Sequence, residues 1–268
     1  MVILGSGNLA WSLAPAIARL SEEGNDIKLL QLYSRNREEG AKLAQLAGVP
    51  YTGSSEKLAE ADLYIMTVAD GAVTELSGKM IIPSGAVVAH TAGSTGIDAI
   101  SPRINNRGVL YPLQTFTKGR EVDFSQIPLF IEYTTPRAEE VIRYLAGKLS
   151  GNVSEASSEI REKIHLAAVF AANFTNHMYV VAEEILKSAG LPFDTVKPLI
   201  GEVAAKAVAS RSPAETQTGP AVRGDMTTVN RHLELLANDK GMTEEYAELL
   251  RKIYETISQS IWETSKKK

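Results

Sequence analysis

The sequence contains no cysteine in its 268 residues. Thiol nucleophiles, iron–sulfur clusters and zinc sites built from thiolates are therefore excluded. A disulfide is not needed for stability either, because a chain of this length can bury a substantial core.

Long apolar runs are also absent. No stretch approaches the roughly 18–20 apolar residues of a membrane span, and the N-terminus has no charged segment followed by the apolar run of a secretion signal. We therefore expect a cytoplasmic protein that has no membrane partner.

Neither sign of charge dominates the composition. Charged residues make up 22% of the chain, hydrophobic residues make up 44%, and the formal net charge is -4. These values are typical of a soluble globular protein, and nucleic acid is not an expected partner. The one dense basic cluster, Lys266-Lys267-Lys268, is interpreted as a solvated terminus.

In the first part of the chain, short apolar runs alternate with segments of helical periodicity. This alternation is typical of parallel strands joined by crossover helices, and it predicts a doubly wound α/β domain of the Rossmann type over residues 1–155. The expected strands are Val2–Leu4, Lys28–Tyr33, Leu63–Val68, Gly85–His90, Gly108–Tyr111, Leu129–Glu132 and Asn152–Glu155, and the expected helices are Leu9–Leu20, Glu38–Ala47 and Arg137–Leu149.

After residue 156 the strand signal disappears, which predicts an all-α helical domain over residues 156–268. The expected helices are Ser157–Ser188, Asp194–Ser210, Arg223–Ala237 and Thr243–Glu263, with a loop at Ser212–Gly219. The first of these would be a single helix of about 30 residues, longer than most globular helices. One small domain is not expected to cover all of its apolar surface, so we predict a homodimer formed through this domain.

A glycine-rich segment directly follows the first expected strand and opens the first expected helix. Gly5-Ser6-Gly7-Asn8-Leu9-Ala10 fits the G-x-G-x-x-G/A pattern of dinucleotide-binding domains. The first glycine permits a tight turn, the second lets the backbone approach a pyrophosphate, and the small third residue lets helix and strand pack closely. The helix N-terminus would then bind the phosphates.

The end of the second strand carries the selectivity for the cofactor. Domains specific for NAD usually place an acidic residue there, whereas this sequence reads Tyr33-Ser34-Arg35-Asn36-Arg37. A hydroxyl from Ser34 and the guanidinium groups of Arg35 and Arg37 suit a 2′-phosphate, so NADP is the predicted cofactor. The alternative is that both arginines are solvated loop residues.

Two further turns follow buried strands and are expected to border the cofactor. They are Val68-Ala69-Asp70 and His90-Thr91-Ala92-Gly93-Ser94. In open α/β sheets, ligands bind outside the carboxyl ends of the strands, which makes residues of these turns candidate contacts. His90 could instead be a hydrogen-bonded structural histidine, and Ser94 or Thr95 could cap a helix.

Several local motifs together resemble a bacterial family of inferred NADP oxidoreductases that have a Rossmann-like N-terminal domain and a helical C-terminal domain. A more distant similarity extends to pyrroline-5-carboxylate reductase and to the group of ketopantoate reductase and 6-phosphogluconate dehydrogenase. The motifs are Gly5–Ala10, His90–Ser94, Tyr111–Phe116, His165–Tyr179 and Gln217–Pro220.

This resemblance implies hydride transfer between NADP(H) and a small imine, ketone or alcohol held between the domains. The alternative is a non-catalytic NADP-binding sensor or scaffold, and a deazaflavin also remains open as the second substrate. Fold analogy alone does not decide between these functions.

Two loops are candidate substrate contacts through the same resemblance. The segment beginning Tyr111-Pro112-Leu113-Gln114 resembles a turn that borders the nicotinamide in pyrroline-5-carboxylate reductases. Gln217-Thr218-Gly219 resembles the start of their Thr-Ser-Pro-Gly-Gly-Thr-Thr substrate loop. The second glycine and the paired threonines are displaced here, to Gly224, Thr227 and Thr228.

The long helix carries polar residues among apolar neighbours. His165, Asn173 and His177 fall on one strip at multiples of four residues, and Asn176 adjoins it. Within a mostly buried helix these groups must find polar partners, which could be a ligand or a second subunit. A buried structural network is the alternative. The two histidines are twelve residues apart with no carboxylate on the strip, so metal binding is the weaker interpretation.

Related dehydrogenases carry a Lys-x-x-x-Asn pair on the corresponding helix, where the lysine moves the proton and the asparagine orients the substrate. This chain has no lysine there. The resemblance therefore assigns substrate orientation to Asn173 or Asn176. His177 is the preferred proton donor and His165 the second candidate, because imidazole titrates close to neutral pH.

Overall fold

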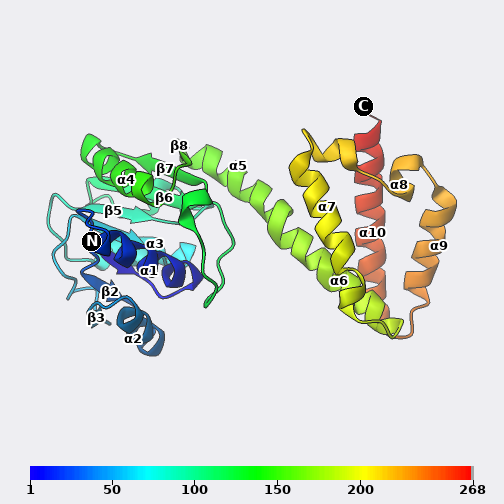
Figure 1. The fold of residues 1–268 in the computed structure, drawn as a ribbon, viewed down its shortest axis with the longest axis horizontal. Helices are drawn as coiled ribbons and strands as arrows, with labels where there is room; N and C mark the ends of the chain where they lie inside the picture. Colours follow the sequence, from blue (N-terminus) through cyan, green and yellow to red (C-terminus); the bar gives the residue numbers. More distant parts are fainter. Residues whose placement is uncertain (267–268) are drawn as a thin grey trace. The chain divides into compact units, whose positions relative to one another are not determined.

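A computed structural model describes residues 1–266 of the chain, so Lys267 and Lys268 of the basic tail lie outside the described residues. Contacts divide the chain into two compact units, Met1–Ala172 and Asn173–Lys268. Most helices and strands of each unit are labelled in Figure 1.

The first unit is built on one eight-stranded sheet with the order β3-β2-β1-β4-β5-β6-β7-β8. Every neighbouring pair is parallel except β6 and β7, which are antiparallel. The strand order reverses between β1 and β4, as in doubly wound sheets, which confirms the predicted fold class. The strands are β1 Val2–Leu4, β2 Gln31–Tyr33, β3 Tyr51–Thr52, β4 Leu63–Met66, β5 Val87–His90, β6 Asn106–Pro112, β7 Leu129–Tyr133 and β8 Val153–Glu155.

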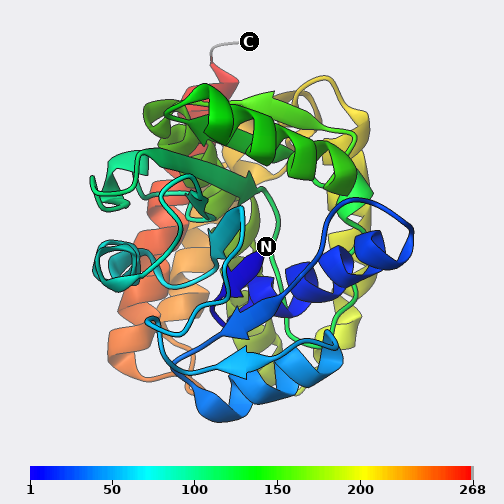
Figure 2. The same ribbon diagram turned by 90° about the vertical axis from the view of Figure 1, so that its left-hand side faces the viewer.

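Helices cover both faces of this sheet (Figure 2). The side chains of strand β1 alternate between the two faces. Ile3 packs into the core on the side of α1, α2 and α4, and Val2 and Leu4 pack into the core on the side of α3. A strand that is buried on both faces has a continuous run of apolar residues in its sequence. The helices of this unit are α1 Asn8–Glu22, α2 Arg37–Leu46, α3 Val73–Lys79, α4 Pro136–Leu149 and α5 Ser158–Ala168, and the 3₁₀ turns are Asp70–Ala72, Ile97–Ala99 and Phe124–Gln126.

The single helix predicted over Ser157–Ser188 is wrong in one respect. A π-helix at Val169–Phe174 separates α5 from α6 Thr175–Ser188. The hydrogen bonds of a π-helix join residues five apart, so each turn holds more residues and the side chains beyond it rotate to another face. The four-residue spacing from His165 to His177 therefore does not mark one continuous strip.

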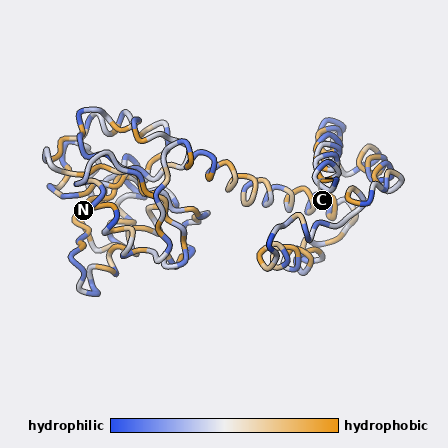
Figure 3. The backbone as a smooth tube through the Cα atoms, turned by 90° about the horizontal axis from the view of Figure 1, so that it is seen from above, coloured by the Kyte–Doolittle hydropathy of each residue, from blue (hydrophilic) through white to orange (hydrophobic). Residues whose placement is uncertain are grey.

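The long helix was also expected to be mostly buried, and this expectation is wrong for the single chain. Leu166, Phe170 and Phe174 have exposed fractions of 58%, 62% and 50%. Hydrophobic and hydrophilic residues both occur along the helical segment that follows β8, as the colours of Figure 3 show. Among residues 1–266, no helix combines the length and hydrophobicity needed to cross a membrane.

The second unit is helical, as predicted, but its predicted third helix, Arg223–Ala237, begins later, at Met226, and Arg223 instead ends a separate short helix, α8. Gly224 ends α8 with a φ of +66°, and the Asp225 side chain accepts a hydrogen bond from the backbone N–H of Thr228 to begin α9. The Pro213–Thr216 part of the predicted loop forms a 3₁₀ turn. Besides α6, this unit contains α7 Lys197–Ala209, α8 Pro220–Arg223, α9 Met226–Ala237 and α10 Glu244–Ser265, with another 3₁₀ turn at Phe193–Thr195.

A glycine in β6 sets how closely helix α4 approaches the sheet. A Cβ atom at Gly108 would lie 1.9 Å from Cδ1 of Ile142 and 3.0 Å from the carbonyl oxygen of Glu132. We expect Gly108→Ala to lower the free energy of unfolding by about 1–3 kcal/mol through overpacking, measured by chemical denaturation.

The matched control is Gly147→Ala in α4, where an added Cβ meets nothing within 4 Å. This substitution should raise the free energy of unfolding by about 0.5–1 kcal/mol, because alanine loses less backbone entropy in a helix. Equal stabilities of the two variants would contradict the proposed packing constraint.

Candidate functional site

The glycine-rich loop lies between β1 and α1 in a conformation that only glycine adopts without strain. Gly5 has a φ of +130°, and a Cβ there would lie 2.5 Å from the carbonyl oxygen of Thr67. Gly7 is the N-cap of α1, no side chain caps this end, and no acidic residue occupies the first turn. The first N–H groups of α1 are thus available to bind an anion.

This loop forms one wall of a cavity of about 460 Å³ at the carboxyl ends of β1, β2 and β4. The volume lies within the usual range for small-molecule sites. Of the residues predicted to bind a cofactor, the lining includes Gly5, Ser6, Gly7, Ser34, Arg35, Val68 and Ala69. Asn8, Leu9, Ala10, Arg37, Asp70, His90 and Thr91 are not part of the lining.

Hydrogen bonds hold the glycine-rich loop against the loop after β2. The hydroxyls of Ser6 and Ser34 are 2.7 Å apart, and Ser34 is buried. The backbone N–H of Asn36 donates to the Ser34 hydroxyl, and the Asn36 side chain caps α2 by accepting from the N–H of Glu39. Arg35 lies between these anchored residues, with its side chain on the cavity wall.

The sequence analysis missed a second cation in this cavity, Lys79. It comes from α3, which was not predicted because its seven residues form too short a periodic pattern. The Lys79 ammonium lies 2.6 Å from the Glu75 carboxylate, which also lines the cavity. This hydrogen bond and the charge of Lys79 lower the pKa of Glu75, and Arg35 adds a smaller effect in the same direction.

His90 ends β5 and is fully buried. Its Nδ1 accepts a hydrogen bond from the N–H of Ala92, and its Nε2 lies 3.3 Å from the carbonyl oxygen of Gly96. Burial, helped by the charge of Arg161, lowers the pKa of His90 to about 4. The neutral imidazole therefore shapes the loop over residues 91–96.

This loop is tied to the turn after β4. The Ser94 hydroxyl donates to Asp70 at 2.5 Å, and the Thr91 hydroxyl donates to the carbonyl oxygen of Met66 at 3.2 Å. These bonds tie the loop over residues 91–96 to the segment over residues 66–70, in which Val68 and Ala69 line the cavity.

Tyr111 and His165 form a hydrogen-bonded pair in the first unit. Tyr111 lies near the end of β6 with an exposed fraction of 8%, and its hydroxyl oxygen is 3.1 Å from Nδ1 of His165 on α5. Burial raises the pKa of Tyr111. The sequence placed both residues near the substrate for separate reasons and did not predict their contact.

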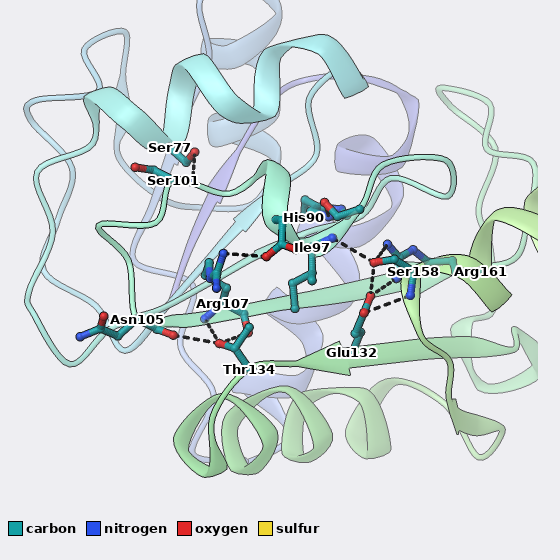
Figure 4. A network of polar contacts seen from close by, with 12 residues as sticks. Ser77, His90, Ile97, Ser101, Asn105, Arg107, Glu132, Thr134, Ser158 and Arg161 are labelled. Carbon is teal, nitrogen blue, oxygen red and sulfur yellow. Dashed lines mark hydrogen bonds and ion pairs between the residues drawn. The ribbon is translucent and has the colours of Figure 1, made fainter.

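A buried ion pair fixes the start of α5 on the sheet (Figure 4). Arg161 has an exposed fraction of 0%, pairs with Glu132 of β7, and donates to the carbonyl oxygen of Thr95 at 2.5 Å. Ser158 donates through its backbone N–H and its hydroxyl to the same Glu132, and its hydroxyl oxygen accepts from the N–H of Ile97. The sequence analysis did not identify this network, because no local motif marks its members.

The remaining predicted residues have the following positions. Pro112 ends β6, and the Gln114 side chain accepts a hydrogen bond from the N–H of Thr115. Three predicted residues of the second unit are exposed, namely Asn173, Asn176 and His177. Its loop residues are Gln217, whose side chain donates to the carbonyl oxygen of Thr218, and Gly219, which precedes α8 with a φ of +114°.

Comparisons with known proteins place these features in a family context. The family model described as "domain of unknown function (DUF2520)" matches residues 127–261. A crystal structure of an inferred NADP oxidoreductase from Bacteroides fragilis is 40% identical, with a TM-score of 0.87 over 98% of this chain and 97% of that chain. None of the curated proteins searched matches the sequence.

Two more distant structures are similar in fold alone. Pyrroline-5-carboxylate reductase from Coxiella burnetii is 17% identical, with a TM-score of 0.52 over 99% of this chain and 97% of that chain. An imine reductase from Myxococcus stipitatus in complex with NADP+ is 13% identical, with a TM-score of 0.59 over 97% of this chain and 94% of that chain. These findings confirm the resemblance noted from the sequence.

The buried His90 makes the stability of the protein dependent on pH. Its pKa is about 4 in the folded chain and near the ordinary 6.5 after unfolding, so the unfolded chain binds more protons between these values. The stability due to the neutral ring is complete above pH 6.5 and is lost as the pH falls toward 4. The full effect should be on the order of 3 kcal/mol.

Urea denaturation across this pH range measures the effect. The acid-induced loss should be smaller in His90→Asn, because asparagine does not titrate while the carboxylates of the protein stay the same. Parallel pH profiles for the wild type and His90→Asn would contradict the assignment.

Proposed function

The chain belongs to the DUF2520 family, and we propose that it is an NADP-dependent oxidoreductase that transfers hydride between NADP(H) and a small imine, ketone or alcohol. The observation that carries this proposal is the cavity of about 460 Å³ at the carboxyl ends of the strands, because it joins an anion-binding helix N-terminus to two cations.

The residues of the cavity fit a dinucleotide. The position of Gly5 has no room for a side chain, so its backbone forms the tight turn that a pyrophosphate site needs. The N–H groups at the start of α1 would bind the pyrophosphate, and their alignment with the helix dipole favours its negative charge. The bound dihydronicotinamide supplies the hydride of the reaction.

Selectivity for NADP is assigned to Arg35 and Lys79, with Ser34 and Arg37 as additional donors. A guanidinium forms two parallel hydrogen bonds to phosphate oxygens, and an ammonium adds a compact charge. Glu75 keeps Lys79 on the cavity wall through their 2.6 Å contact. A 2′-phosphate would compete with Glu75 for this ammonium.

Substrate handling is assigned to both units. Tyr111, Pro112 and Gln114 of the first unit, and Gln217, Thr218 and Gly219 of the second, are the proposed substrate contacts. Asn173 or Asn176 would orient the reacting group, and His165 and His177 are the histidines proposed to move a proton. The contribution of the protein is thus positioning and proton transfer.

A homodimer formed through the helical unit is part of this proposal. Helix α7 contains no buried residue although it is rich in apolar side chains. Leu199 and Val203 lie four residues apart on one face with exposed fractions of 62% and 58%. An apolar helix left exposed in this way is typical of a surface that a second copy covers.

We expect Arg35→Ala to weaken NADPH binding by about 10- to 150-fold, the loss of a charge-assisted hydrogen bond of about 1.5–3 kcal/mol, and to change NADH binding little. Lys79→Ala should have an effect of the same kind, because it also leaves the Glu75 carboxylate facing the phosphate. Titration calorimetry with NADPH and with NADH measures the change in each affinity for both variants.

Lys42→Ala is the matched control, since Lys42 is an exposed cation on α2 outside the cavity lining. It should leave both affinities unchanged. Equal losses for NADPH and NADH in Arg35→Ala would show that Arg35 does not select the 2′-phosphate. Tight NADPH binding without reduction of any carbonyl, imine or deazaflavin would favour the sensor function.

Light scattering should find a dimer at micromolar concentration. Leu199→Glu combined with Val203→Glu should shift the protein toward monomer, because two carboxylates would be buried in the interface. Glu202→Gln on the same helix is the control and should leave the mass unchanged. A monomeric wild type would contradict the proposed assembly.

A further inference from the structure

We propose that the Tyr111 hydroxyl is the proton donor of the reduction and that His165 then reprotonates the Tyr111 oxygen. The inference rests on the proposed reductase function and deepens it. A proton donor supplied by the protein implies a substrate whose heteroatom must gain a proton during the reduction. The substrate class is therefore a carbonyl compound or a neutral imine, rather than a permanently charged iminium.

The contact between the two side chains has the geometry of a proton relay. The Tyr111 hydroxyl and His165 Nδ1 are 3.1 Å apart, and their rings meet edge to face at an interplanar angle of 72°. A phenol has one donor and two acceptor positions, and imidazole can donate at one nitrogen while it accepts at the other. When Nδ1 donates to the phenolic oxygen, the phenolic proton is available to a substrate.

The pair lies at the edge of the sheet that carries the cofactor cavity. Strands β5 and β6 run parallel with His90 opposite Val109, so Tyr111 is level with the loop that follows β5. The Ser94–Asp70 hydrogen bond joins this loop to the turn after β4, where Val68 and Ala69 line the cavity.

Gly93 makes room for the pair. A Cβ atom at this position would lie 2.6 Å from His165 Nδ1 and 2.9 Å from Cζ of Tyr111. Gly93 is not among the glycines with positive φ, so space rather than backbone conformation requires glycine here. Any other residue would force the hydroxyl and the imidazole apart.

The buried ion pair at the start of α5 sets the position of the imidazole. His165 follows Arg161 by four residues, which places it one helical turn farther along the same face. Arg161 is held by Glu132 and Thr95, and the same Glu132 binds Ser158. The helix that carries His165 is therefore fixed to β7 and to the loop after β5.

The step balances in atoms and electrons. The substrate carbon accepts the hydride, the π pair of its C=O or C=N bond moves to the heteroatom, and NADPH is oxidised by two electrons to NADP+. The heteroatom takes the proton from the Tyr111 oxygen. The phenolate then takes the proton from His165 Nδ1 in the same step in which the ring gains a proton at Nε2 from solvent, so the ring stays neutral and the reaction consumes one solvent proton overall.

The test compares two substrate classes in the same variants. A library of ketones and neutral imines, together with N-alkylated iminium salts, is assayed by NADPH absorbance. Tyr111→Phe should lower kcat for the ketones and neutral imines by about 10²- to 10⁴-fold, the usual contribution of general acid catalysis. It should change the rates for the iminium salts by less than about threefold, because these need no proton.

Three further variants separate the roles of the neighbouring residues. His165→Gln and Gly93→Ala should slow the same ketone and neutral-imine reactions while leaving the iminium rates and NADPH affinity intact. His232→Gln is the matched histidine control, because His232 Nδ1 lies 2.7 Å from the Tyr254 hydroxyl in a similar pair that has no assigned role, and it should leave the dependence on substrate class unchanged. ¹⁵N spectra of the histidine rings should show that Tyr111→Phe shifts one resonance, the one missing in His165→Gln.

The outcomes distinguish the two proposals. A Tyr111→Phe variant as fast as the wild type on ketones and neutral imines, or equally slowed on both substrate classes, would overturn the inference and leave the reductase function standing. An unshifted histidine resonance would overturn it independently of turnover. A wild type that binds NADPH but reduces no member of the library would contradict the proposed function, and the donor role of Tyr111 with it.

Discussion

The ion pair between Arg161 and Glu132 is the contact on which the arrangement of the site depends. A fully buried guanidinium is costly unless it is paired and hydrogen-bonded. Here its two terminal nitrogens bind the Glu132 carboxylate, the Thr95 carbonyl oxygen and the Ser158 hydroxyl, while its Nε has no hydrogen-bond partner among the described residues. Substituting Glu132 would leave the buried charge of Arg161 without a counter-charge, and substituting Arg161 would leave the Glu132 carboxylate without one. The pair therefore holds the first turn of α5 in one position against β7. Because α5 is a regular helix, this also fixes where its later residues lie.

The first unit has two chemically distinct regions along the same edge of its sheet. The glycine-rich loop, Arg35 and Lys79 form a region suited to anions, while Tyr111, His165 and Gly93 form a compact region suited to proton transfer. The loop over residues 91–96 connects them, and the neutral His90 shapes that loop from inside the core.

Some features were predictable because their causes are local in sequence. The continuous apolar strands, the glycine spacing around Gly5 and the basic residues after β2 are short-range patterns. The first predicted the doubly wound fold, and the other two predicted residues that line one cavity. Helix α3 was missed because seven residues are too few for a clear periodicity, and Lys79 was missed with it. The π-helix at Val169–Phe174 was also missed, because its residues are ordinary helix formers.

The sequence by itself determined the fold class, the position of the glycine-rich turn between β1 and α1 and the absence of thiol chemistry, since each follows from residue identity and spacing alone. Only the tertiary structure decided which distant residues meet. Tyr111 and His165 are 54 positions apart, and Arg161 and Glu132 are 29 apart. Contacts over such separations depend on strand order and on the packing of α5, and no local pattern encodes them.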